Sequence, residues 1–280
     1  MTDPLMSLDE AIETIRRTPQ NASLVRDAYF DVDVTAAVHR FADSSEFAET
    51  LKLAGERANG VVLDVGAGRG ISSYAFARAG ARQVIALEPD PSDVVGLGAL
   101  RQAIGDLPIE ALAAYAEAIP LPNASCDLVY ARQVLHHIPD LPAAMREVAR
   151  VLKSGGMFLA CREHVVDDDA QLASFLASHP VHQLAGGENA YRMDQYIGAM
   201  QNAGLRVQQI IRPWDSVITA FPGARSQAEL NEGYVRSQRR RLRYPLRIGQ
   251  YIPGVVSAVR RVHADPGYPG RMFAFVASKP

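Results

Sequence analysis

The chain has 280 residues, of which 48% are hydrophobic and 21% are charged, and its formal net charge is −2. This composition supports a packed globular core and gives no electrostatic case for nucleic acid as the main partner. Cys126 and Cys161, the only two cysteines, form neither a disulfide framework nor a zinc spacing, and we expect both to be buried free thiols. No apolar run approaches the roughly 18 residues of a membrane span, so we expect a cytoplasmic protein.

The first 55 residues carry helical patterns. Ser7 and Glu10 fit a capping box, because the serine can accept from the third amide of the helix while the glutamate reaches back. Apolar residues then recur on one face until Pro19 ends the helix. Three further short helices are expected over residues 23–30, 34–41 and 45–54.

Residues 61–70 form the most informative stretch of the chain. Residues 61–65 are a short, β-branched, apolar run, which is typical of a buried parallel strand. Gly66, Gly68 and Gly70 then predict a tight turn, because glycine tolerates a positive φ and allows a ligand to approach the backbone. Helical composition follows over residues 71–79. Strand, turn and helix together predict the nucleotide-binding corner of a doubly wound α/β sheet.

The spacing of this turn discriminates between ligands. It is G-x-G-x-G, and Ile71 stands where a dinucleotide-binding fingerprint has its last glycine. Asp64 lies just before the turn, where a carboxylate disfavours a pyrophosphate on the following helix. A ligand that carries an amino group and a sulfonium suits Asp64 better, so an NAD-dependent oxidoreductase is disfavoured.

Further strands and helices follow at regular intervals. Residues 83–87 are an apolar strand, and Glu88 at its end is placed to accept hydrogen bonds from ribose hydroxyls, unless it is only a solvated strand-end residue. Ligands of open α/β sheets bind outside the carboxyl ends of such strands. The other expected strands cover residues 110–115, 127–131, 157–161, 205–211 and 271–278, and the other expected helices cover residues 91–106, 141–152, 167–178 and 191–203.

Five stretches resemble, in order and spacing, the class I S-adenosylmethionine-dependent methyltransferases. Residues 61–70 resemble motif I, and the other four stretches are residues 84–88, 116–122, 126–131 and 151–158. The resemblance covers about residues 61–164. It implies a Rossmann-like, doubly wound, seven-stranded sheet whose last strand is antiparallel and is inserted at the sheet edge. The implied organisation is a helical lid (1–55), a cofactor-binding core (56–165), remaining core elements with an inserted substrate cap (166–270) and the final strand (271–280).

The resemblance also implies S-adenosylmethionine as cofactor. The residues that it implies for cofactor binding are Asp64, Gly66, Ala67, Gly68, Gly70, Glu88, Pro89, Ala116, Glu117, Ala131, Arg132 and, from the lid, Tyr29. Arg40 is a second residue of the lid that could cover the cofactor. The alternative is that Tyr29 only packs between helices and that Arg40 only lies on the surface. Tyr115 departs from the family, which commonly has an aspartate there for the adenine amino group. Either Tyr115 contacts adenine, or Glu117 and the backbone amide of Ala116 do.

Methyl transfer is an in-line displacement at a sulfonium carbon, so the enzyme mainly orients donor and acceptor. An oxygen acceptor with a high pKa also needs a general base or a metal. We expect the candidates on the loops after strands four and five, namely His136, His137, Glu163 and His164. The first choice is His136 or His137, of which only one should reach the acceptor because adjacent residues on a turn point in different directions. A structural hydrogen-bonding role is the alternative for each histidine.

A polar, glycine-bearing loop is expected over residues 179–189. His179 and His182, with Glu188 nearby and His164 upstream, have ligand types that suit a divalent metal. Pro180 disfavours a regular helix through the two histidines, so we expect no metal site and interpret the loop as substrate recognition. The basic run over residues 236–247 is interpreted as a solvated helix face and not as a phosphate or lipid contact.

The sequence therefore predicts an S-adenosylmethionine-dependent methyltransferase that acts on a small molecule, most favourably at an oxygen. The segment from residue 162 to 191 is also similar to a bacterial subgroup associated with cell-surface glycan and secondary-metabolite genes, which points to a sugar or glycan precursor or a secondary metabolite. The alternatives are an N- or C-methyltransferase and a non-catalytic binding module, which the departure at Tyr115 permits. The methyl acceptor and the oligomeric state do not follow from the sequence.

Overall fold

A computed structural model describes residues 5–238, 252 and 254–280. Its sheet has the strand order β3-β2-β1-β4-β5-β8-β7, and a short β6 pairs with β5 outside this path. The strands are β1 Val61–Val65, β2 Gln83–Leu87, β3 Ile109–Leu112, β4 Cys126–Arg132, β5 Leu152–Val166, β6 Tyr191–Arg192, β7 Arg206–Ile211 and β8 Arg271–Ser278. Strands β1 to β5 pair in parallel, and β8 is antiparallel to its neighbours. The predicted doubly wound α/β sheet with an antiparallel last strand is confirmed.

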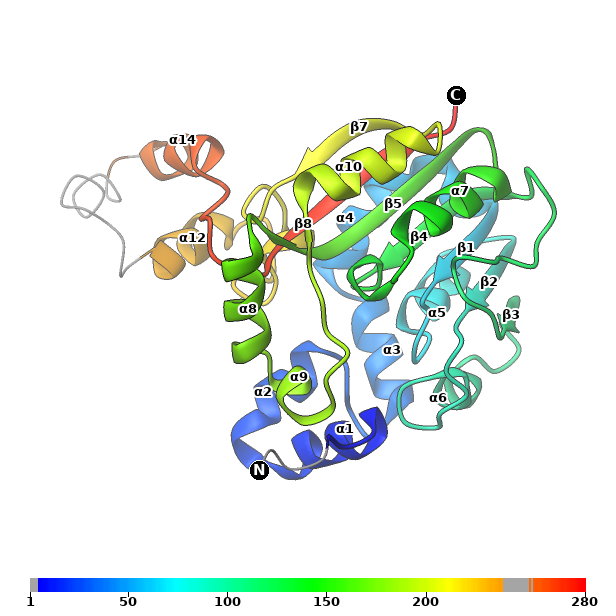
Figure 1. Ribbon diagram of the computed structural model, residues 1–280, viewed down its shortest axis with the longest axis horizontal. Coiled ribbons are helices and arrows are strands. Elements are labelled where there is room, and N and C mark those ends of the chain that lie inside the picture. The colour runs from blue at the N-terminus through cyan, green and yellow to red at the C-terminus, as the bar shows by residue number, and fades with distance from the viewer. Residues whose placement is uncertain (1–4, 239–251, 253) are drawn as a thin grey trace.

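Helices cover both faces of this sheet (Figure 1). They are α1 Leu8–Arg17, α2 Ala22–Asp27, α3 Val34–Ala42, α4 Ser45–Ala54, α5 Ile71–Arg78, α6 Leu97–Ala103, α7 Leu141–Val151, α8 Asp169–Ser178, α9 Pro180–Ala185, α10 Met193–Asn202, α11 Val217–Ala220, α12 Leu230–Gln238 and α14 Val255–Val262. The predicted capping box at α1 is confirmed, because Ser7 Oγ accepts from the Glu10 amide and Glu10 accepts from the Ser7 amide. Of the described helices, none is long and apolar enough to cross a membrane.

Two apolar clusters form the core, one on each face of the sheet. Leu63 and Val129 pack beneath α7 and α10, whereas Val62 and Tyr130 pack beneath α3, α4 and α5. This two-sided burial explains the continuous apolar runs of the central strands. Cys126 and Cys161 are buried free thiols within the two clusters, as predicted.

The final strand does not lie at the sheet edge, contrary to expectation. Strand β8 lies between β5 and β7, so β7 forms the edge. The burial pattern gives the reason. Phe275 and Val276 of β8 are buried on opposite faces, whereas β7 exposes Gln208 and Gln209 to solvent. A strand that is apolar on both faces belongs inside a sheet, and polar side chains suit an edge.

Two strand ends also differ from the sequence-based expectation. Strand β5 continues past Cys161 to Val166, because β8 pairs with Glu163 and His164 beyond a register shift near Arg162. Glu163 and His164 therefore lie on a strand and not in a loop. Strand β3 ends at Leu112, which leaves Tyr115 in a loop with 67% of its surface exposed.

Two helices also begin where the sequence did not predict them. The return helix after β2 starts only at Leu97, because Ser92 Oγ accepts from the Val94 and Val95 amides and holds a turn before it. Pro180 starts α9 at a first-turn position, where its missing N–H costs no hydrogen bond. The expectation of an irregular loop is therefore wrong for residues 180–185. Most of the basic run over residues 236–247 lies outside the described residues.

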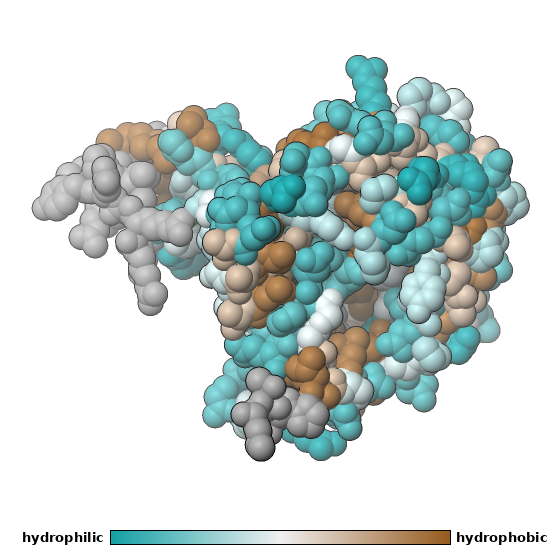
Figure 2. Space-filling view, in the orientation of Figure 1, coloured by the Kyte–Doolittle hydropathy of each residue, from teal (hydrophilic) through white to brown (hydrophobic). Residues whose placement is uncertain are grey.

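Helices α1, α2 and α9 lie together at one end of the molecule (Figure 1). Ile12 and Ile15 of α1 pack against Val181 of α9, and the Met6 amide donates to the Leu184 carbonyl. In the space-filling view, hydrophobic residues gather over α8, α9 and α14, and hydrophilic residues cover most of the surface over α7 and α10 (Figure 2). Segments from both halves of the chain therefore meet beside the carboxyl ends of the parallel strands.

Candidate functional site

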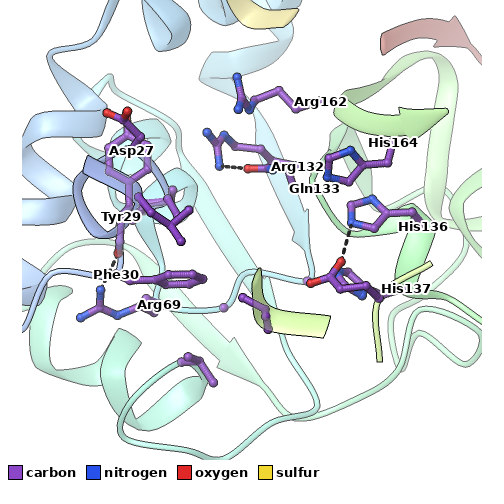
Figure 3. A pocket seen from close by; sticks show the side chains of 18 of the residues that line it. Asp27, Tyr29, Phe30, Arg69, Arg132, Gln133, His136, His137, Arg162 and His164 are labelled. Carbon is purple, nitrogen blue, oxygen red and sulfur yellow. Dashed lines mark hydrogen bonds and ion pairs between the residues drawn. The ribbon is translucent and has the colours of Figure 1, made fainter. Parts of the chain in front are cut away.

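A cavity of about 630 Å³ lies at the carboxyl ends of β1 and β4. This is within the size range of small-molecule and cofactor sites. Figure 3 shows His136, His137 and His164 on one side, Tyr29, Phe30 and Arg69 on the other, and Arg132 and Arg162 between them. Of the predicted site residues, the lining includes Asp64, Gly66, Ala67, Gly68, Arg132, Tyr29, His136, His137 and His164. Gly70, Glu88, Pro89, Ala116, Glu117, Ala131 and Glu163 are not part of this lining.

The glycine turn forms one wall of the cavity. Gly66 has a φ of 63°, and a Cβ built there would lie 2.2 Å from Val134 Cγ2 of the β4 loop. Gly70 has a φ of 78°, and its Cβ would lie 2.8 Å from Leu100 Cγ. Both the backbone conformation and the close packing therefore require glycine at these two positions. The turn is held against β4 and α6, as a backbone cradle for a ligand needs.

Asp64 sits at the base of this wall. Its side chain is buried, and Oδ2 accepts a hydrogen bond of 2.6 Å from Ser73 Oγ. Burial raises the pKa of Asp64 to about 7, because a carboxylate loses its hydration inside the protein. A cationic group at this position would recover part of that cost. The amino group of an amino-acid cofactor therefore fits the residue.

Glu88 lies behind the turn, outside the cavity lining. One carboxylate oxygen accepts from the Gly68 amide at 2.8 Å and the other from the Asp90 amide at 2.9 Å. Each oxygen keeps a lone pair for a further donor, such as a ribose hydroxyl. Burial raises the pKa of Glu88. Its two backbone contacts tie the end of β2 to the glycine turn.

Two buried arginines, Arg132 and Arg162, also line the cavity, and Arg132 pairs with Glu46, which does not line it. The sequence did not single out Arg162 or Glu46. Arg132 donates to both oxygens of Glu46 on α4, at 2.7 and 3.1 Å. Burial works against the charge of Arg132, but attraction to Glu46 outweighs it and raises the pKa of the guanidinium. Arg162 donates Nη1 to the Phe221 carbonyl at 3.0 Å, and burial lowers its pKa.

Histidines form the opposite wall, and each is held through Nδ1. The His136 Nδ1 lies 2.7 Å from Glu163 Oε2, and the His164 Nδ1 lies 2.6 Å from the Gly270 carbonyl. Burial lowers the pKa of both histidines well below the usual value, and it raises the pKa of Glu163. The expectation that only one of His136 and His137 reaches the acceptor stays a prediction. Both line the cavity, with ring centroids 4.2 Å apart.

Of the residues considered for the lid and for contact with adenine, only Tyr29 lines the cavity. Tyr29 lines the cavity with a φ of 60°, and its carbonyl accepts from Arg69. Arg40 does not line this cavity and instead pairs with Asp31. The side chain of Tyr115 is mostly exposed, whereas Ala116 is buried beside Ile119 in the cluster beneath α7.

Fold and cavity together define a doubly wound α/β protein with a small-molecule-sized cavity at the carboxyl edge of its sheet. A family profile described as "Methyltransferase domain" matches residues 63–160. The chain is 31% identical to the 27-O-demethylrifamycin SV methyltransferase of Amycolatopsis mediterranei, over 61% of this chain and 66% of that protein. It is 30% identical to the ubiquinone biosynthesis O-methyltransferase of Xanthomonas euvesicatoria, over 59% and 70%. It is 33% identical to the uncharacterized methyltransferase YcgJ of Bacillus subtilis, over 49% and 53%.

Solved structures agree on the fold. A geranyl diphosphate methyltransferase in complex with S-adenosylmethionine superposes with a TM-score of 0.56 at 14% identity, over 99% of this chain and 97% of that chain. A methyltransferase structure from Bacillus halodurans gives 0.54 at 19% identity, over 84% and 99%. The chain belongs to the class I S-adenosylmethionine-dependent methyltransferases, whose methyl donor is S-adenosylmethionine. It spans only 53% and 66% of the first curated relatives that it matches.

Proposed function

We propose that this chain transfers a methyl group from S-adenosylmethionine to an oxygen atom of a small molecule. One observation carries the proposal. A single cavity has the glycine turn with Asp64 on one wall and His136, His137 and His164 on the other. A methyl donor bound at the turn would therefore face imidazoles that can orient or deprotonate a hydroxyl.

The residues around the turn fit S-adenosylmethionine, which supplies an activated methyl group when bound. Asp64 would pair with its amino group, and Glu88 would accept from its ribose hydroxyls. Gly66, Gly68 and Gly70 would let its methionine part approach the backbone, with Ala67, Pro89, Ala131 and Arg132 beside it and Ala116 and Glu117 at the adenine. Tyr29 would cover the cofactor from the N-terminal side.

The acceptor would bind between this cofactor and the histidines. We place His136 or His137 nearest its hydroxyl, with His164 next and Glu163 holding His136. Segments 1–55 and 166–270 would act as lid and cap, since Tyr29 from the first and His179 from the second both line the cavity. Exclusion of water by such a cover favours methyl transfer. The names of the rifamycin and ubiquinone relatives support oxygen as the methylated atom, and we favour a sugar or glycan precursor or a secondary metabolite.

Calorimetry with S-adenosylhomocysteine and with NAD tests the cofactor, and a panel of hydroxylated acceptors incubated with labelled S-adenosylmethionine tests the reaction. We expect binding of S-adenosylhomocysteine, no binding of NAD, and label on an oxygen located by NMR. Binding of NAD alone would refute the cofactor assignment. Cofactor binding with label on nitrogen or carbon would favour the alternative transferases, and binding without transfer to any acceptor would favour a binding module.

A further inference from the structure

Three electron-pair donors converge on one wall of the cavity. His136 Nε2 and His137 Nε2 lie 3.9 and 3.7 Å from the same oxygen, Glu188 Oε2. All three ligand atoms lie within 4.8 Å of one another. They come from the short 3₁₀ turn Leu135–His137 and from the loop after α9, about fifty residues further along the chain. Only the fold brings them together.

The hydrogen bonds of the two imidazoles engage Nδ1 and leave both Nε2 atoms facing Glu188. His137 Nδ1 lies 3.3 Å from the Gly187 carbonyl, which can only accept, so in the neutral ring Nδ1 carries the hydrogen. His136 Nδ1 faces Glu163 Oε2, an oxygen that also accepts from the His136 amide. When Nδ1 is the donor in both neutral rings, each Nε2 directs a lone pair toward Glu188 Oε2, and neither contact is short enough for a hydrogen bond.

We propose that His136, His137 and Glu188 bind one divalent transition-metal cation. Two protein ligands that are each about 2.0–2.2 Å from a metal lie about 3–3.5 Å apart, so the observed separations need only small side-chain movements. Two imidazole nitrogens and one carboxylate oxygen suit Zn²⁺, Co²⁺ or Mn²⁺, whereas Mg²⁺ prefers oxygen ligands. The ion would neutralise the repulsion among the three lone pairs.

The surroundings of the cluster match those of metal-binding histidines. Such histidines donate their other ring N–H to a carboxylate or a backbone carbonyl, which fixes the ring orientation. Here Glu163 fills that role for His136, and the Gly187 carbonyl fills it for His137. His179 places Nδ1 3.6 Å from the other oxygen of Glu188, and this nitrogen has no hydrogen-bond partner among the described residues.

Three protein ligands leave a coordination position open, and all three residues line the cavity. A hydroxyl oxygen bound there would lose its proton to water more readily, and the two histidines would then act on the acceptor through the ion. This catalytic part rests on the proposed function. Cation binding itself does not, because it needs neither cofactor nor acceptor.

The test is a titration of the chelator-treated full chain with Co²⁺, followed by visible spectroscopy, and by calorimetry with Zn²⁺. We expect one equivalent to bind and to give the d–d bands of a low-symmetry N/O site. His137→Ala and Glu188→Gln should each weaken binding at least tenfold. His263→Ala is the control, because it removes an exposed histidine outside the cluster and should leave binding unchanged. Circular dichroism of each metal-free variant verifies that it is folded.

Two results would overturn the site: the absence of saturable Co²⁺ binding to the wild-type chain, or equal affinity in the wild type and both folded cluster variants. The catalytic part has a separate test. If methyl transfer is found, EDTA should reduce turnover and Zn²⁺ or Mn²⁺ should restore it. Turnover that is indifferent to EDTA would overturn the role of the ion in the reaction, whatever the binding data show.

Discussion

Asp64 should make the stability of the folded chain depend on pH, and Asp64→Asn should remove that dependence. Burial raises the pKa of this carboxyl from the usual 3.8 to about 7 in the folded state. The folded state therefore binds the proton more tightly than the unfolded state. The contribution of Asp64 to the free energy of unfolding is highest below pH 4, falls as the pH rises from about 4 to about 7, and is constant above that range. The whole difference corresponds to about 4 kcal/mol, of which about 3 kcal/mol lies between pH 5 and pH 8.

The assay is urea denaturation of wild-type and Asp64→Asn protein at pH 5, 6, 7 and 8. Asparagine stays neutral and can still accept from Ser73 Oγ, so the variant should gain about 3 kcal/mol relative to the wild type as the pH rises from 5 to 8. All other titrating groups are shared and cancel in the difference. Asp106→Asn, which changes an exposed aspartate, is the control and should run parallel to the wild type.

A constant difference between wild type and Asp64→Asn across this range would refute the reasoning. It would mean that the carboxyl is already ionised in the folded state at pH 5, and that water or a nearby cation offsets its burial. Ionisation of Asp64 in the folded state would then have no free-energy cost that a cationic cofactor group could reduce. The proposed pairing of Asp64 with the cofactor amino group would lose its physical basis.

Three further changes test other parts of the site. Gly66→Ala should lower the free energy of unfolding by at least about 1–2 kcal/mol in urea denaturation, because the residue has a positive φ and its Cβ would overlap Val134; an unchanged midpoint would contradict this. Glu88→Ala should weaken S-adenosylhomocysteine binding by about 1.5–3 kcal/mol in calorimetry, and an unchanged dissociation constant in a folded variant would remove Glu88 from the ribose site. Glu46→Ala should cost about 3–5 kcal/mol of stability, since it leaves buried arginines unpaired, whereas Glu49→Ala on the same helix breaks an exposed pair and should cost under about 1 kcal/mol. Equal losses of stability in Glu46→Ala and Glu49→Ala would show that the buried ion pair stabilises the fold no more than the exposed one.

The central sheet was predictable from the sequence because its strands are buried on both faces. Continuous apolar runs such as residues 61–65 and 83–87 have few other interpretations, and the glycine turn between β1 and α5 marks where they connect. The extension of β5 was not predictable in the same way. Arg162, Glu163 and His164 have the composition of a loop. Strand β5 reaches them only because β8 pairs with Glu163 and His164, and because both side chains have buried hydrogen-bond partners, His136 for Glu163 and the Gly270 carbonyl for His164.

The candidate site was predictable only in its local part. Residues of the glycine turn are adjacent in sequence, so their spacing already predicts their geometry. The pairing of Arg132 with Glu46 joins residues 86 positions apart, and no local pattern indicates it. Glu188 faces His136 and His137 only because α9 starts at Pro180 and returns the following loop to the cavity. Contacts of this kind depend on tertiary packing and not on periodicity.

The contact between α1 and α9 has a consequence for how molecules enter and leave the cavity. Ile12 and Ile15 near the start of the chain and Val181 from the later segment share one small apolar cluster. Moving only the segment with α1, or only the segment with α9, away from the cavity would expose these side chains to water. The cost is about 25 cal/mol for each Å² of apolar surface that is exposed. Movement of both segments together preserves the cluster. The cluster therefore couples two segments that are more than 160 residues apart in sequence, so that a substitution at Val181 in α9 should also loosen the packing of α1.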